Sequence, residues 1–102
     1  MKKYVLSTGA DRDLDEIWEY IARDNIDAAD RWIERLFDAF AMLARTPGAG
    51  HRREDITALP VLFWPVGAYL IIYRAPKAER IQIVAVTQGA RDIPSLLSRR
   101  TQ

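Results

Sequence analysis

The chain has 102 residues, of which 49% are hydrophobic, and it contains no cysteine. A chain of this length builds one domain around a single core. The lack of cysteine excludes a disulfide framework, a thiolate metal site and a cysteine nucleophile. No apolar stretch is long enough for a secretion signal or a membrane span. We therefore expect a soluble, cytoplasmic protein without direct membrane contact.

The net charge of +1 conceals an asymmetry between the two halves of the chain. Residues 1–44 carry a formal charge of −4, and residues 45–102 carry +5. A basic second half suggests an anionic partner, either nucleic acid or an acidic protein segment. Ordinary solubilising arginines on a small domain explain the same pattern equally well.

The first third of the chain predicts a short strand followed by a helix. Residues 3–6 alternate as a strand does, and residues 10–22 carry one apolar stripe at helical spacing. Ser7 and Thr8 are candidate N-caps, followed by acidic residues that suit the helix dipole. Asn25, a residue that tolerates the left-handed conformation, is expected to end this helix.

A second amphipathic helix is expected to begin with Asp27 as its cap and to end at Thr46 and Pro47. The linker of residues 25–27 is so short that the two helices must run antiparallel, with one joint apolar face that covers a sheet. Aromatic residues at helical spacing on these helices are interpreted as core rather than as a ligand site. They are Trp18, Trp32, Phe37 and Phe40.

Residues 47–60 form the one long irregular segment, marked by glycines and prolines. His51 is the only histidine, so no second histidine or cysteine completes a metal site with it, and we assign it no catalytic role. Arg52 and Arg53 are better candidates, because a guanidinium binds a carboxylate or phosphate through two hydrogen bonds.

The second half predicts three consecutive antiparallel strands and a short helix. Residues 59–74 are rich in β-branched and aromatic residues and are divided by a turn at Gly67. Residues 80–87 alternate with period two, and apolar residues at helical spacing surround Pro94. The predicted fold is α+β: an N-terminal strand and an antiparallel helical hairpin packed on a mainly antiparallel sheet (β-α-α-β-β-β), with a short C-terminal helical segment.

No sequence motif for catalysis is present. The chain lacks a glycine-rich phosphate loop, a GxSxG elbow, an HExxH motif and paired histidines. The carboxylates are concentrated on the two helices, where a solvated face is their simplest explanation. These observations favour a binding protein without a catalytic residue, a metal or a cofactor.

Short runs along almost the whole chain resemble the ParE branch of the RelE/ParE toxin superfamily. They are Tyr4–Leu6–Ser7, Asp13–Leu14–Asp15–Glu16–Ile17, Tyr20–Ile21, Ala44–Arg45–Thr46–Pro47–Gly48, Gly50–His51–Arg52–Arg53–Glu54–Asp55–Ile56, Phe63–Trp64–Pro65–Val66–Gly67, Tyr69–Leu70–Ile71–Ile72–Tyr73–Arg74 and Gly89–Ala90–Arg91–Asp92–Ile93. Their order and spacing carry the resemblance, from about Tyr4 to Leu97. It implies one toxin domain over residues 1–97 and a C-terminal tail over residues 98–102.

The resemblance implies the toxin component of a type II toxin–antitoxin system, of the kind associated with plasmid stabilisation. Such a toxin inhibits DNA gyrase without being an enzyme, blocks replication, and is neutralised by a ParD-like antitoxin in a hetero-oligomer. By analogy, the antitoxin would lay a C-terminal segment into a groove between the helical hairpin and the sheet. An acidic segment there would complement the basic half of this chain.

Two alternatives remain. The RelE branch of the superfamily cleaves ribosome-bound messenger RNA with basic residues and a tyrosine near the C-terminus. This chain has no tyrosine or histidine after Tyr73 and only Lys77 among lysines of its second half, which leaves that reaction short of a proton donor or acceptor. An inactive relative that only binds an antitoxin is also compatible with the residues.

The candidate partner-binding residues, for antitoxin or gyrase, are mostly basic. They are Arg52, Arg53, Arg74, Arg91, Asp92, Arg99 and Arg100. By the resemblance, Arg74, Arg91 and Asp92 match family positions at the lip of the expected groove. An internal arginine–aspartate pair that anchors the terminal segment is the alternative explanation for Arg91 and Asp92.

Overall fold

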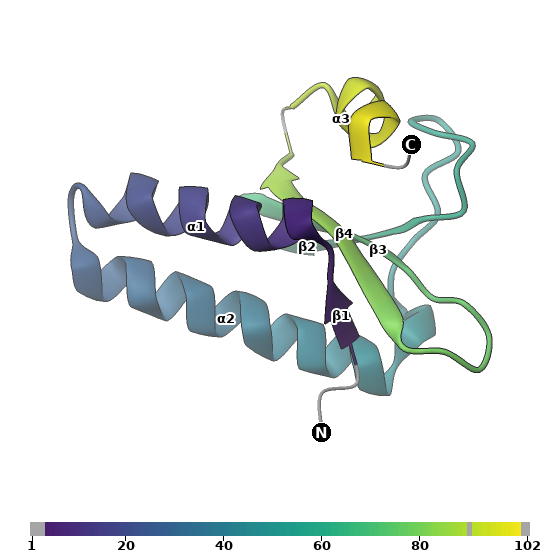
Figure 1. The fold of residues 1–102 in the computed structure, drawn as a ribbon, viewed down its shortest axis with the longest axis horizontal. Helices are drawn as coiled ribbons and strands as arrows, with labels where there is room; N and C mark the ends of the chain where they lie inside the picture. Colours follow the sequence, from purple (N-terminus) through teal and green to yellow (C-terminus); the bar gives the residue numbers. More distant parts are fainter. Residues whose placement is uncertain (1–3, 90, 101–102) are drawn as a thin grey trace.

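The structure, a computed structural model, describes residues 4–89 and 91–100. Two long helices separate the first strand from a run of three further strands (Figure 1). The elements are β1 (Tyr4–Leu6), α1 (Thr8–Ala22), α2 (Ile26–Arg45), the 3₁₀ turn η1 (Pro47–Ala49), β2 (Leu62–Val66), β3 (Tyr69–Arg74), β4 (Ile81–Gln88) and α3 (Ile93–Arg100). The predicted α+β fold and its element order are confirmed. Lys3, the first residue of the expected strand, lies outside the described residues.

Side-chain caps begin both long helices. The Ser7 hydroxyl accepts the backbone N–H of Ala10 at 3.0 Å, as the sequence predicts. At the second helix, Asn25 Oδ1 accepts the N–H of Ala28 at 2.9 Å, and the φ of Asn25 is −161°, which is extended. Two expectations are thereby wrong. Asn25 begins α2 instead of ending α1 in a left-handed conformation, and Asp27 lies in the first turn, where its charge suits the helix dipole.

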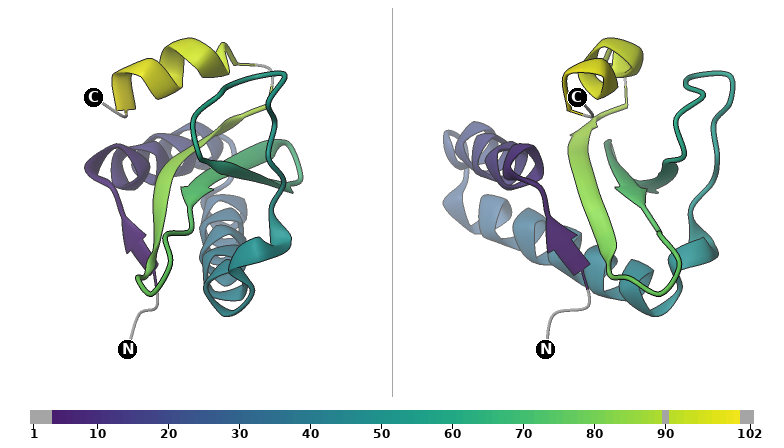
Figure 2. Two further views of the ribbon diagram at one scale, coloured as in Figure 1. Left: turned by 90° about the vertical axis from the view of Figure 1, so that its right-hand side faces the viewer. Right: turned by 45° about the vertical axis from the view of Figure 1, so that its right-hand side comes forward.

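The four strands form one mixed sheet in the order β1-β4-β3-β2. Strands β2, β3 and β4 pair antiparallel in succession, as predicted. β1 adds to β4 in parallel and reaches no further than Leu6 opposite Ile83. Helices α1 and α2 run antiparallel along one face, whereas α3 packs on the other face of the sheet (Figure 2).

The turn between β2 and β3 requires glycine for two reasons. Gly67 has a φ of +59°, in the left-handed region that favours glycine. A Cβ at this position would also lie 2.6 Å from Cη2 of Trp32 on α2. The turn therefore sets the hairpin and at the same time fits closely against the helix that covers it.

β4 contains one residue more than the strand beside it. The pairing register shifts between Ile72 and Tyr73, and Val84 is the extra residue. Ile83 before it and Val86 after it both belong to the core beneath α1 and α2. They are three residues apart and would face opposite sides of a regular strand, so the extra residue is what places both on one face. The uniform alternation expected along the whole strand is therefore wrong in its second half.

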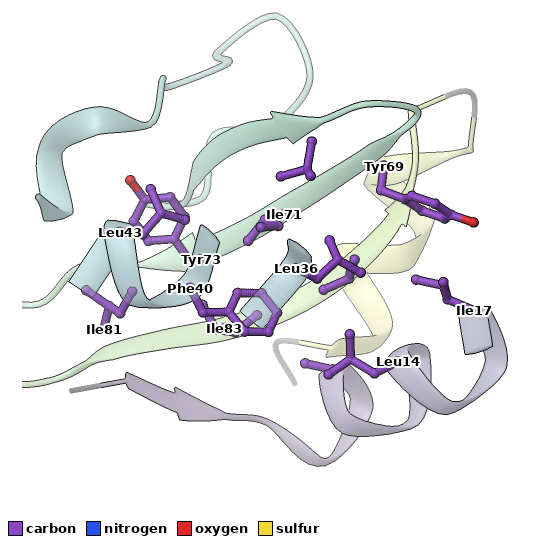
Figure 3. Close-up of a cluster of buried hydrophobic side chains, with 13 residues drawn as sticks. Leu14, Ile17, Leu36, Phe40, Leu43, Tyr69, Ile71, Tyr73, Ile81 and Ile83 are labelled. Carbon is purple, nitrogen blue, oxygen red and sulfur yellow. The ribbon is translucent and has the colours of Figure 1, made fainter. Parts of the chain in front are cut away.

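Apolar cores lie on both faces of the sheet. The helix-side core in Figure 3 combines residues from α1 and α2 with residues from the strands: Leu14, Ile17, Leu36, Phe40, Leu43, Tyr69, Ile71, Tyr73, Ile81 and Ile83. The second core joins α3 to the other face: Val61, Phe63, Ile72, Val84, Ala85, Ile93, Leu96 and Leu97. Each large apolar side chain buried in this way contributes about 1.5–3 kcal/mol relative to exposure. Together the two cores hold both layers of helices on the sheet.

The four aromatic residues predicted as core have different environments. Phe40 is fully buried, and Trp32 and Phe37 are partly buried against the helix-side core. Trp18 lies at the surface of the helical hairpin, where its indole N–H donates to Asp30 Oδ1 at 2.8 Å. None of them forms a separate aromatic box.

The irregular segment 47–61 is anchored to the sheet at two points. The buried Tyr73 hydroxyl donates to the carbonyl oxygen of Pro47 and accepts the N–H of Gly50, both at 2.8 Å. Burial raises the pKa of Tyr73, so the phenol remains a donor at neutral pH. One residue later, His51 exchanges two backbone hydrogen bonds of 2.9 Å with Phe63 on the outer edge of β2.

Candidate partner-binding site

Two of the predicted arginines are neutralised within their own loop. Arg53 donates through Nε and Nη2 to the two carboxylate oxygens of Asp55, at 3.0 and 2.8 Å. Arg52 Nη2 lies 3.8 Å from Glu54 Oε1. The Arg53 hydrogen bond lowers the pKa of Asp55. A partner carboxylate would have to compete with these local acids for either arginine.

Arg100 forms a different kind of pair. Its Nη2 donates to Asp13 Oδ1 at 2.7 Å and its Nη1 to Asp13 Oδ2 at 2.9 Å, in a bidentate geometry. The Asp13 side chain is 8% exposed and that of Arg100 is 22% exposed. The hydrogen bond to Asp13 raises the pKa of Arg100. Because α3 extends to Arg100, this pair anchors the part of the predicted tail (residues 98–102) that the structure describes; residues 101–102 lie outside the described residues.

The same pair closes an edge of the sheet that no strand covers. Beyond Ile83, none of the described strands pairs with β4 on the β1 side. The carbonyl oxygen of Val84 accepts the Ser7 hydroxyl at 3.0 Å and Arg100 Nη1 at 3.2 Å, and Asp13 Oδ2 accepts the N–H of Val86 at 2.9 Å. Side chains from α1 and α3 therefore make the hydrogen bonds that a neighbouring strand would make.

Asp92 has a local structural role. Its Oδ2 accepts the Ser95 hydroxyl at 2.8 Å and its backbone carbonyl accepts the N–H of Leu96 at 3.2 Å, so it caps the N-terminus of α3. Within the described residues, Arg91 and Asp92 form no ion pair, so the internal pair considered for them is not found. The arginine–aspartate pair that anchors α3 is formed by Asp13 and Arg100.

Arg91 lies at a hollow of about 230 Å³ at the end of β4. No ion pair of Arg91 occurs within residues 4–89 and 91–100. The hollow is lined by Asp13, Glu16, Ile17, Tyr20, Tyr69, Val86, Thr87, Gln88 and Arg91. Burial, and the neighbouring Tyr20, raise the pKa of Tyr69. The lining mixes carboxylates, phenols and one guanidinium, which suits a polar side chain of a partner.

The remaining two candidates lie elsewhere. Arg74 ends β3 opposite Gln82, and its Nε is buried without a hydrogen-bond partner in the described part of the chain. Tyr69, at the other end of β3, lines the hollow, so Arg74 is about 17 Å along the strand from it. Arg99 is exposed on α3. The structure therefore does not gather the seven candidate residues at one place.

The groove expected between the helical hairpin and the sheet is filled by the protein's own side chains. Leu36 and Phe40 on α2 and Ile71 on β3 are fully buried there. The hollow beside Arg91 opens between α1 and the ends of β3 and β4. Sequence reasoning missed Glu16 and Tyr20 at this hollow, because both read as ordinary residues of the exposed helix face.

Other classes of site find little support. Within the described ranges, no group of three or more histidine, cysteine, aspartate or glutamate side chains is placed to hold a metal ion. The His51 side chain is exposed, and its backbone rather than its imidazole forms the bridge to Phe63. Of the helices that the structure describes, none is both long and apolar enough to cross a membrane.

Comparison with known proteins supplies the family. The model of the ParE toxins of type II toxin–antitoxin systems, parDE, matches residues 4–93. The fold is similar to a solved chain of the "Chromosomal ParDE TA system from P. aeruginosa", with a TM-score of 0.70 and 19% sequence identity over 83% of this chain and 92% of that one. None of the curated proteins matches the sequence. Since the family model spans most of the chain, the protein belongs to the ParE toxin family of type II toxin–antitoxin systems.

Proposed function

We propose that this protein inhibits DNA gyrase and so blocks replication, and that a ParD-like antitoxin neutralises it in a hetero-oligomer in the cytoplasm. The observation that carries the proposal is the family match over residues 4–93, which includes all four strands and both long helices. Binding alone, without a covalent step, accounts for this activity.

The chemistry of the hollow supports action by binding rather than by messenger cleavage. The more buried of the two phenols there, Tyr69, is protonated at neutral pH, since burial raises its pKa above the ordinary tyrosine value, and it therefore does not act as a general base. The sequence holds no tyrosine or histidine after Tyr73 that would replace it. Cleavage of messenger RNA, the activity of the RelE branch, is therefore the less supported alternative.

The antitoxin contact is proposed around Arg91, with Arg74 and Arg99 as further contacts. None of the three is in an ion pair within the described residues, which leaves their guanidinium groups for a partner, except that Nε of Arg74 is buried. An acidic antitoxin segment that enters the hollow would pair with Arg91. The formal charge of +5 on residues 45–102 would speed the encounter.

The function is tested with purified protein in a gyrase supercoiling assay and in a reconstituted translation mixture. We expect inhibition of supercoiling and accumulation of cleaved DNA bound to gyrase, with ribosome-bound messenger left intact. Addition of a ParD-like antitoxin should restore supercoiling. Cleaved messenger together with unimpaired supercoiling would reassign the protein to the RelE type of activity. If neither assay responds, the protein is an inactive relative.

The antitoxin contact is tested separately, by titration calorimetry with charge-reversal variants. Arg91→Glu should weaken antitoxin binding by about tenfold or more, because it loses one ion pair and creates a repulsion. Arg45→Glu, at an exposed position in the last turn of α2, is the matched control and should bind as the unmodified protein does. Equal affinities of the two variants would refute the placement at Arg91 and leave the gyrase assay as an independent result.

A further inference from the structure

The exposed face of α2 carries two arginines, Arg31 and Arg35, that form no ion pair within the described residues. Arg31 and Arg35 are four residues apart, so their side chains are neighbours on the helix, and like charges at this spacing destabilise it. No ion pair of either residue occurs in the part of the chain that the structure describes. Asp27, one turn before Arg31, does not approach it closely enough to form one. Acidic residues three and four positions away on the same helix offset part of this cost, but none of them forms an ion pair with either arginine in the described part of the chain.

The indole of Trp32 holds one of these arginines in place. The guanidinium carbon of Arg35 lies 4.6 Å from the centroid of the Trp32 ring, in a cation–π contact. On its other side, Trp32 packs edge-to-face on Tyr69, with 5.3 Å between the ring centroids. Gly67 leaves no room for a Cβ against the same indole. A fixed ring below the guanidinium orients its N–H groups before any ligand arrives.

The two arginines and the tryptophan surround an open hollow of about 300 Å³, whose fourth side is the small side chain of Ala28. The loop arginines provide a contrast, since Arg53 is fully engaged with Asp55 in a bidentate pair. The hollow on α2 thus offers two guanidinium groups around an aromatic surface, with free donors. Such an arrangement suits the carboxylate of an incoming side chain.

The neighbouring charges indicate which anion fits. At 3.6 residues per turn, Asp27, Glu34 and Asp38 form an acidic row along the flank of Arg31. A nucleic acid presents a continuous row of phosphates and would be repelled along this flank. A polypeptide with one or two acidic side chains places its charge at the arginines alone.

We propose that Arg31, Trp32 and Arg35 form a second partner-binding site, which takes an acidic polypeptide segment through its carboxylates. The site lies on the exposed face of α2, on a different element from the candidate residues of the proposed function, and it does not depend on gyrase or antitoxin binding. Arg35 supplies the oriented donor and Arg31 the second charge.

The probe is a short peptide with two glutamates flanked by neutral residues, titrated into the full-length protein and followed by the NMR signals of the residue 28–35 amides and the Trp32 indole N–H. We expect these signals to move, with an affinity that falls as salt rises. The double variant Arg31→Gln and Arg35→Gln should lose at least about tenfold in affinity, because two charge-assisted hydrogen bonds disappear. Its free energy of unfolding should change little, because removal of the like-charge repulsion is offset by loss of the cation–π contact and of the attraction to the acidic neighbours.

The matched control replaces two other exposed helix arginines, Arg12→Gln and Arg45→Gln, which changes the net charge equally. This variant should keep the affinity within about twofold, as expected for a site-specific rather than a net-charge effect. Equal losses in the two double variants would overturn the proposal, as would the absence of any shift at residues 28–35. A single-stranded oligonucleotide that binds the same residues more tightly than the peptide would also overturn it.

Discussion

The two open edges of the sheet are closed by different means. On the β4 edge, beyond the end of β1, three side chains take the hydrogen-bonding groups of the strand: Ser7, Asp13 and Arg100. On the β2 edge, the backbone of His51 pairs with that of Phe63. The first closure depends on the identity of single residues. The second depends on where the chain runs, so it tolerates changes of side chain.

The same contrast separates the two arginine–aspartate pairs that accompany these edges. In the β4 edge pair, the Asp13 side chain is 8% exposed, whereas the Asp55 side chain of the loop pair is 65% exposed. Both have short, bidentate hydrogen bonds. Water solvates the free ions of the loop pair almost as well as the pair itself, but it cannot reach a buried carboxylate left alone.

The largest effect is expected at Asp13. Replacing Asp13 by Ala leaves Arg100 without its partner and the Val86 N–H without an acceptor, so the free energy of unfolding should fall by about 2–4 kcal/mol. Urea unfolding measures the change. A double-mutant cycle with Arg100→Met separates the pair from the backbone bond. A loss no greater than that of Arg53→Ala would contradict the contrast between the two edges.

A smaller effect is expected at Tyr73, which anchors the segment leading to His51. The Tyr73→Phe variant leaves the N–H of Gly50 and the carbonyl of Pro47 without their partner, and about 1–3 kcal/mol of stability should be lost. Thermal and urea unfolding measure it. Tyr20→Phe, at a phenol that is 63% exposed, is the control and should leave the midpoint unchanged.

Ser7 should contribute less again. Ser7→Ala removes the α1 cap and one of the two donors to the Val84 carbonyl, while Arg100 still reaches that oxygen. The expected loss is about 1 kcal/mol, typical of an N-cap. A Ser7→Thr variant keeps the hydroxyl and should recover most of the stability in the same unfolding experiment. Failure of threonine to do so would indicate that shape, rather than the hydrogen bond, matters there.

The loop pair should contribute least. Arg53→Ala should leave the unfolding midpoint unchanged at neutral pH, because both partners are exposed. The pKa of Asp55 is lowered in the folded state. Any contribution of the Arg53–Asp55 pair to folding stability is therefore present above the ordinary aspartate pKa and is lost as pH falls through the lowered value. A comparison of Asp55→Asn with the unmodified protein across this acidic range checks the sign. A clear difference at neutral pH would contradict the small contribution.

Local patterns explain what the sequence predicts well. The two long helices follow from apolar residues at helical spacing, and the Ser7 cap and the end of α2 at Arg45 follow from local hydrogen-bonding chemistry. The β2–β3 hairpin follows from its apolar strands and the glycine turn. It is harder to predict which of Asn25 and Asp27 caps α2, because both residue types cap helices and only the backbone conformation decides between them.

The candidate site is predicted less well, since it depends on contacts distant in sequence. Asp13 and Arg100 are separated by 87 residues, and no periodicity relates them. The charge of Arg52 and Arg53 predicts a partner contact, but both form ion pairs with acids of their own loop. Whether an arginine is available to a partner depends on its neighbours in space, which a residue-type argument does not reveal.

The extra residue in β4 has a consequence for changes in chain length. Deleting Val84 would leave Ile83 opposite Tyr73 and Ala85 opposite Ile72, so the ladder to β3 would survive intact. The deletion would remove the carbonyl to which Ser7 and Arg100 both donate. A one-residue deletion, which ordinarily turns the rest of a strand over, would here spare the sheet and loosen the C-terminal helix instead.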